Sequence, residues 1–239
     1  LFGSRSVTFH LAAYAWLIML VVVGLGNPWP VPRLSRHNLG ALAVQALAQQ
    51  RGLAWQWRWG CLCWMAVDDV TNVALVMPAV PYNLAGPAVR RALDSLGASC
   101  HDLTVVHDDI DLAPGRSSVK QSGSAGGNRG VRSILDSLGS DAVRRVRLGV
   151  GRPAGSDRGP MAVGAHVLSE LEEELLERWC GVDASSHGSG PGPLDVLLWP
   201  PQAHEACKPR RGPVAKESRG SHAQPHSRSV NGMCTGSHD

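Results

Sequence analysis

The stretch that decides the fold is VVVGLGNPWPVPRLSRHNLG, residues 21–40. It begins with β-branched apolar residues, turns through a loop rich in glycine and proline, and ends where a helical period begins. In the segment 38–50, apolar residues recur three and four positions apart, as on the buried face of a helix. A strand, a loop and a helix in this order open an α/β unit.

The loop itself starts with GLGNPW, which can be compared with the phosphate-binding fingerprint G-x-G-x-x-G. Trp29 takes the place of the third glycine, prolines follow where a helix should open, and no acidic residue stands at the expected distance downstream. The dinucleotide interpretation is therefore weak. A simple turn and half of a catalytic site remain as alternatives for Asn27 and His37.

Apolar runs and helical periods continue to alternate along the chain. They predict further strands at 73–77, 103–107 and 146–150, and helices at 84–96, around 131–138 and at 168–179. The alternating residues Trp55, Trp57 and Trp59 predict another half-buried strand, and with a single intervening arginine, core packing is favoured over base stacking. Together these elements predict a single α/β domain with a twisted mixed β-sheet flanked by helices.

Composition divides the 239 residues into an N-terminal extension (1–18), the α/β domain (19–180) and a tail (181–239). The tail is rich in Gly, Pro, Ser and His, so it cannot bury enough apolar surface to offset its ordering entropy, and we expect it to be disordered or atypical. The apolar stretch 11–23 is too short to span a bilayer, so we expect no membrane association.

Charge and cysteine content restrict the function less sharply. The formal net charge of +3 permits a polyanionic partner without requiring one. The 6 cysteines include no C-x-x-C pair and no histidine pair at zinc spacing, which favours free thiols.

Asn38, Asn83 and Asn128 each stand at or just before the start of a predicted helix. N-capping would explain any one of them alone. Taken together, the turns that carry them bring Asn27, His37, Asn83 and the glycine loop towards one edge of the sheet, which is where open α/β sheets bind ligands.

The segment HDDIDLAPG, residues 107–115, places several carboxylates just past a buried strand. It can be a solvated turn, or a divalent metal site on Asp108, Asp109 and Asp111. It can also supply a carboxylate that fixes the tautomer of His37. Sequence spacing leaves the three open, because the pairing would cross the fold.

A family signature runs through the blocks VVVGLGNP, SRHNLG, YNLAG, VVHDDIDLAPG, VKQSGSAGG, GVRSILDSLGS and RVRLGVGRP, in order from about residue 19 to residue 170. On these blocks the chain resembles the bacterial-type peptidyl-tRNA hydrolases. The resemblance implies an esterase that cleaves the bond between a peptide and the 3′ end of tRNA and needs no metal or other cofactor. It also implies a monomer that binds the acceptor end of peptidyl-tRNA and serves translation and ribosome rescue in the cytoplasm or mitochondria. A non-enzymatic RNA-binding relative, of the splicing-factor kind, is the alternative.

Carried over by position, the resemblance implies that His37 is the general base and that Asp108 holds and polarises it. It implies that Asn27 and Asn83 bind the peptidyl ester, with Asn83 donating to the oxygen that becomes anionic.

Three positions near these residues depart from the family pattern. Tyr82 replaces the usual methionine, and we include it with the substrate-binding residues. The glycine loop reads GSAGGNRG, so Asn128 takes the place of the family's histidine and Arg129 that of its asparagine, a shift of about 100° around a helix. Either Asn128 compensates and still binds substrate, or that contact is lost, activity is weakened and Arg129 presents its charge to the tRNA.

The resemblance also implies phosphate contacts and a longer domain. Lys120 and Arg147 match basic residues that contact tRNA in the family, and a further set of arginines could extend this surface: Arg116, Arg144 and Arg145. After AHVLSELEEELLERWC the family continues in a helix that helps cover the cleft, whereas this chain turns to GVDASSHGSGPGP. Reduced stability is the expected consequence.

Overall fold

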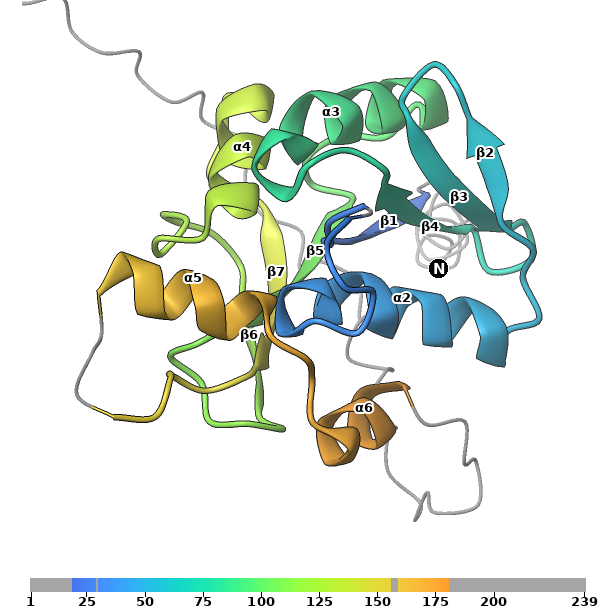
Figure 1. Ribbon diagram of the computed structural model, residues 1–239. Coiled ribbons are helices and arrows are strands. Elements are labelled where there is room, and N and C mark those ends of the chain that lie inside the picture. The colour runs from blue at the N-terminus through green and yellow to red at the C-terminus, as the bar shows by residue number, and fades with distance from the viewer. Residues whose placement is uncertain (1–18, 29, 156–158, 181–239) are drawn as a thin grey trace, which may run out of the picture.

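A seven-stranded mixed sheet runs between two layers of helices in the computed structural model of the protein, which describes residues 19–28, 30–155 and 159–180 (Figure 1). The strand order is β2-β3-β4-β1-β5-β7-β6. The strands are β1 (Leu20–Gly24), β2 (Gln56–Arg58), β3 (Cys63–Asp68), β4 (Val73–Pro78), β5 (Leu103–Asp109), β6 (Ser117–Lys120) and β7 (Arg144–Gly149).

The central strands β4, β1, β5 and β7 are parallel, and the outer strands β2, β3 and β6 are antiparallel to their neighbours. Strands of a parallel sheet are covered on both faces, which requires a continuous apolar run. In β1 the side chains of Val21, Val22 and Val23 are all fully buried. The predicted mixed sheet flanked by helices is therefore confirmed.

Helices cover both faces of this sheet (Figure 1). The helices α2 (Leu39–Gln50) and α6 (Glu173–Cys180) form one core with Val22, and α3 (Ala85–Leu96) and α4 (Arg129–Leu138) form the other with Val21 and Val23. Two short 3-10 turns, η1 (Arg36–Asn38) and η2 (Tyr82–Leu84), precede α2 and α3. Both turns follow the carboxyl ends of parallel strands, so they lie at one edge of the sheet.

The predicted helix at 168–179 is wrong in its extent. Helix α5 (Pro160–Leu168) ends where that helix was expected to begin, and α6 starts only at Glu173. Between them the main chain bonds to the loop before η1: Arg36 N donates to Ser169 O, and Leu171 N donates to Leu34 O. These long-range bonds interrupt a stretch whose local sequence favours a helix.

The tryptophan strand is shorter than predicted. Trp55 and Trp57 are half-buried. Trp59 lies beyond the end of β2 and is 79% exposed, so the prediction that it packs in the core is wrong. The Trp57 ring meets Trp59 and Trp64 edge-on, with ring centroids 5.4 and 5.3 Å apart. The aromatic cluster therefore lies on the surface of the β2–β3 hairpin.

The expectations for residues 1–18 and 181–239 fall outside the described residues. No helix in the described part of the chain combines the length and the apolar composition needed to cross a membrane.

Two glycines allow α2 to approach the sheet closely. A Cβ on Gly40 would lie 2.3 Å from the carbonyl oxygen of Val106, and one on Gly24 would lie 2.6 Å from the carbonyl oxygen of Gly40. Ala41 N also donates to Leu25 O at 2.9 Å. These contacts fix the first turn of α2, and with it the preceding η1, against β1 and β5.

We expect Gly40→Ala to lower the free energy of unfolding by about 1–3 kcal/mol, because the new methyl group meets main-chain atoms that cannot move aside. Urea unfolding would measure this change. Gly164→Ala in α5 is the matched control: its Cβ meets nothing within 4 Å, so the exchange should be neutral or stabilising by up to about 1 kcal/mol. Equal losses in the two variants would contradict the close approach.

Candidate active site

The site forms where the loops after β1 and β4 meet the end of β5. The register pairs Gly24, the last residue of β1, with Val106, so β5 continues beyond β1 to Asp109. Asp108 thus lies past the end of β1, at the carboxyl edge where η1 and η2 stand. That edge is the usual ligand-binding edge of an open α/β sheet.

His37 and Asp108 form a close pair at this edge. The Nδ1 atom of His37 lies 2.9 Å from Oδ1 and 3.0 Å from Oδ2 of Asp108. The Asp108 side chain is 3% exposed and that of His37 is 20% exposed. A carboxylate in this position accepts the proton of Nδ1 and so leaves Nε2 as the nitrogen that can take a proton. The structure therefore brings together the residues predicted as base and orienting acid.

The neighbouring carboxylates face other partners. Asp109 Oδ2 accepts from Arg147 at 3.1 Å, and Asp111 pairs with Arg152. Among the residues that the structure describes, no group of three His, Cys, Asp or Glu side chains could hold a metal ion. Of the three interpretations of HDDID, the orienting carboxylate is the one that this geometry supports.

Tyr82 is part of the support beneath the pair. Its ring stacks on the His37 ring, with centroids 3.6 Å apart and an interplanar angle of 22°. Its hydroxyl donates to Asp108 Oδ1 at 2.9 Å, and burial together with the Asp108 charge raises the pKa of Tyr82 well above its ordinary value. Because Tyr82 is only 3% exposed, it has almost no surface for a substrate, in contrast to the expectation from sequence.

Asn128 is also turned inward. Its Oδ1 accepts from Val131 N at 3.0 Å, the predicted N-cap of α4, and its Nδ2 donates to the Tyr82 hydroxyl at 3.0 Å. With both ends of the amide engaged, this geometry does not support the substrate contact expected of Asn128. Arg129, the first residue of α4, is exposed.

Asn27 and Asn38 tie the loops together. Asn27 Oδ1 accepts from Tyr82 N at 3.0 Å, and Asn27 N donates to Asn38 Oδ1 at 2.6 Å. Asn38 also donates to Pro32 O and makes no side-chain cap to α2, so the N-cap explanation is wrong for it. Asn83 follows Tyr82 in η2 and is exposed. Sequence reasoning missed the loop-fastening role of Asn38, although its place in SRHNLG, beside the predicted base, marked it for attention.

The predicted phosphate-binding residues separate into accessible and buried groups. Lys120 lies on the edge strand β6 and its Nζ is 3.4 Å from Ser124 O. Arg147 is 28% exposed, with its guanidinium held by Asp109 and Ser118. Arg116 is exposed, as Arg129 is.

Two of the arginines predicted to contact phosphate are buried, Arg144 and Arg145. Because β6 pairs with β7, β7 is not an edge strand, and Arg144 and Arg145 are 3% and 2% exposed. Arg144 donates to Thr104 Oγ1 and Arg145 to Ser124 O, and burial lowers the pKa of both guanidinium groups. The prediction that these two arginines contact tRNA phosphates is therefore wrong.

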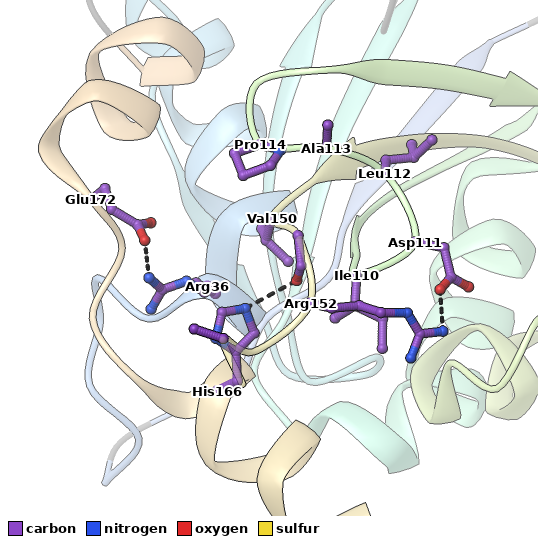
Figure 2. A pocket seen from close by; sticks show the side chains of 12 residues that line it. Arg36, Ile110, Asp111, Leu112, Ala113, Pro114, Val150, Arg152, His166 and Glu172 are labelled. Carbon is purple, nitrogen blue, oxygen red and sulfur yellow. Dashed lines mark hydrogen bonds and ion pairs between the residues drawn. The ribbon is translucent and has the colours of Figure 1, made fainter. Parts of the chain in front are cut away.

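A cavity of about 640 Å³ adjoins η1, and neither His37 nor Asp108 lines it. Figure 2 shows its charged groups paired: Arg36 with Glu172 and Arg152 with Asp111. Arg36 also donates to Ser169 Oγ and Glu170 O, so it fastens η1 to the segment between α5 and α6. The lining residues are Arg36, Ile110, Asp111, Leu112, Ala113, Pro114, Val150, Gly151, Arg152, Ala154, His166 and Glu172.

A family model described as peptidyl-tRNA hydrolase matches residues 21–183 of the sequence. The chain belongs to the peptidyl-tRNA hydrolase family. It is similar to the peptidyl-tRNA hydrolase of Caulobacter vibrioides, with 41% identity over 160 residues, covering 65% of this chain and 76% of that protein. It is similar to that of Bacillus velezensis, with 36% identity over 157 residues, covering 65% of this chain and 81% of that protein.

Solved structures lead to the same family. The crystal structure of peptidyl-tRNA hydrolase from Acinetobacter baumannii matches with a TM-score of 0.61 and 25% identity, covering 66% of this chain and 80% of that one. The predicted membership of the peptidyl-tRNA hydrolase family is confirmed. The roles of individual residues stay predictions.

We expect Arg36→Ala to lower the free energy of unfolding by about 2–3 kcal/mol, because it removes charge-assisted hydrogen bonds from a buried guanidinium. Thermal or urea unfolding would measure it. Arg33→Ala in the same loop is the control, since the Arg33 side chain is exposed and bonds only to Gln45 in the described part of the chain, and a change within about 0.5 kcal/mol is expected there. Similar losses in the two variants would contradict the clamp formed by Arg36.

Proposed function

We propose that this member of the peptidyl-tRNA hydrolase family cleaves the ester between a peptide and the 3′ end of tRNA, with His37 as the general base. The observation that carries the proposal is the His37–Asp108 pair: Nδ1 is held at 2.9 Å by a buried carboxylate. In the described part of the chain no hydrogen bond occupies Nε2.

The reaction follows from this arrangement. Nε2 of His37 takes a proton from water as the water oxygen attacks the ester carbonyl carbon. The Asp108 carboxylate stabilises the imidazolium that forms. When the tetrahedral intermediate collapses, the bond to the ribose 3′ oxygen breaks and the imidazolium returns the proton to that oxygen. The products are the free peptide acid and a tRNA with a 3′ hydroxyl.

The asparagines provide donors for this chemistry. With its oxygen held by Tyr82 N, the Asn27 side chain retains its amide nitrogen as a donor for the ester. Asn83, exposed beside Tyr82, is the donor for the oxygen that becomes anionic. A donor placed for a developing charge is worth about 10²-fold or more in rate.

The acceptor end of the tRNA is the partner that fits the basic residues. The accessible members of that group are Lys120, Arg116, Arg129 and Arg147. Phosphate contacts by such residues give affinity with little dependence on sequence. Asp109 neutralises part of the Arg147 charge, so Lys120 and Arg129 carry more of this role.

The non-enzymatic RNA-binding alternative is not favoured. A binding protein has no need of an imidazole fixed by a buried carboxylate, and the relatives named above are hydrolases.

We expect His37→Ala to reduce the rate of N-acetyl-aminoacyl-tRNA cleavage by about 10²- to 10⁴-fold, because the general base is lost. Single-turnover release of the blocked amino acid would measure it. His101→Ala is the control, since His101 precedes β5 at the opposite end of that strand from Asp108, and its rate should match that of the unmodified protein.

Equal rates for the His37→Ala variant and the unmodified protein would rule out this mechanism. Tight tRNA binding without turnover in the unmodified protein would instead support the RNA-binding alternative.

For the tRNA surface, we expect Lys120→Ala to weaken binding of deacylated tRNA and to reduce the slope of log K against log salt by about one, because one phosphate contact is lost. Filter binding over a range of salt concentrations would measure the slope. Arg91→Ala removes the same charge from an exposed position on α3 and should leave the slope unchanged. Identical slopes in all three proteins would exclude Lys120 from the interface.

A further inference from the structure

We propose that Tyr82 is a positioning residue that keeps the His37–Asp108 pair deprotonated and ready to act, and that Asn128 fixes the direction of the Tyr82 hydroxyl. This inference rests on the proposed function, in which the pair acts as the general base. It assigns a common role to Tyr82 and Asn128, two of the positions where the sequence departs from the family pattern.

The contacts of Tyr82 join three segments that are distant in the sequence. Its ring lies against His37 of η1, its hydroxyl donates to Asp108 of β5, and the same hydroxyl accepts from Asn128 at the start of α4. A hydrogen-bonded chain therefore leads from the N-terminus of α4 to the catalytic pair.

The direction of the Tyr82 hydroxyl is set by Asn128. The Oδ1 atom of Asn128 is occupied by Val131 N, so its Nδ2 faces Tyr82 and can only donate. The tyrosine oxygen accepts that bond, and its single hydrogen goes to Asp108 Oδ1 at 2.9 Å. Burial and the Asp108 charge raise the pKa of Tyr82 well above its ordinary value, so the hydroxyl keeps this hydrogen throughout the working range of pH.

Asp108 depends on this donor because it has few others. In the described part of the chain, the hydrogen bonds to its carboxylate come from His37 and Tyr82 alone. A buried carboxylate needs such bonds to stay ionised. Without the Tyr82 bond the buried carboxylate would keep His37 as its hydrogen-bond partner in the described part of the chain, and its charged form would be less stabilised. Protonation of the pair removes the base.

The other titratable groups around the pair are engaged elsewhere. His107 Nδ1 lies 2.7 Å from Asp108 O and 3.3 Å from Asn128 Nδ2, and burial lowers the pKa of His107, so this ring stays neutral near pH 7. On the elements that pack here, Arg36 pairs with Glu172 and Asp109 with Arg147, while Arg144 donates to Thr104 Oγ1 and Arg145 to Ser124 O. The charged residues of α4 are exposed: Arg129, Arg132 and Asp136. Tyr82→Phe changes none of these partners.

The test is the pH dependence of kcat/KM for Tyr82→Phe, which removes the hydroxyl and keeps the ring on His37. We expect the midpoint of the acid limb to move up by about half a pH unit, which is a roughly threefold lower rate below the midpoint and an unchanged rate at high pH. Asn128→Ala should move the midpoint in the same direction by less. The double variant should resemble Tyr82→Phe, since Asn128 reaches the Asp108 carboxylate through the Tyr82 hydroxyl.

An NMR titration of the His37 ring in the free protein gives a readout that does not depend on turnover, and its midpoint should rise in Tyr82→Phe as well. A rate that falls equally at every pH, with an unmoved His37 titration, would assign Tyr82 to packing alone and overturn the proposal. An unchanged profile would overturn it too. Full activity in His37→Ala would instead refute the proposed function, so the two failures are distinguishable.

Discussion

Asp108 is a buried carboxylate that must be hydrogen-bonded, and the loops of the candidate active site are arranged around that requirement. The donors come from His37 after β1 and from Tyr82 after β4. Each loop is brought within reach by the packing beneath it: Gly24 and Gly40 let α2 lie against β1 and β5, and Asn27 holds Tyr82 N. The hydrogen bonds that this buried carboxylate requires thus specify how the two loops meet.

The sequence was most informative where local pattern and tertiary environment agree. The apolar run 21–23 predicts the first strand, and the ordered motif blocks predict the family and the pairing of His37 with Asp108 across the fold. The predictions failed where contacts with distant segments decide the secondary structure or the burial of a residue. Main-chain bonds to residues 34–36 split the predicted helix 168–179, and the cover provided by β6 buries Arg144 and Arg145.

The roles of Tyr82 and Asn128 could not be found in the sequence for a related reason. Taken singly, Tyr82 is a tyrosine at a position where the family has methionine, and Asn128 is an asparagine one position before the family's asparagine. Their hydrogen bond joins η2 to α4 across 46 positions of sequence separation, and nothing in either segment indicates it. One signal was available: a tyrosine on a buried face needs a partner for its hydroxyl. That rule predicts a polar neighbour for the hydroxyl, but it does not predict that this neighbour is Asp108.

The hydrogen bonds among Asn38, Asn27 and Tyr82 also bear on the energetics of turnover. They connect the loop after β1 to the loop after β4 through amide groups within the domain. The ordering entropy of both loops is therefore lost when the chain folds, before any tRNA arrives. An active site built this way needs little reorganisation on binding, so more of the interaction with substrate is available to stabilise the transition state.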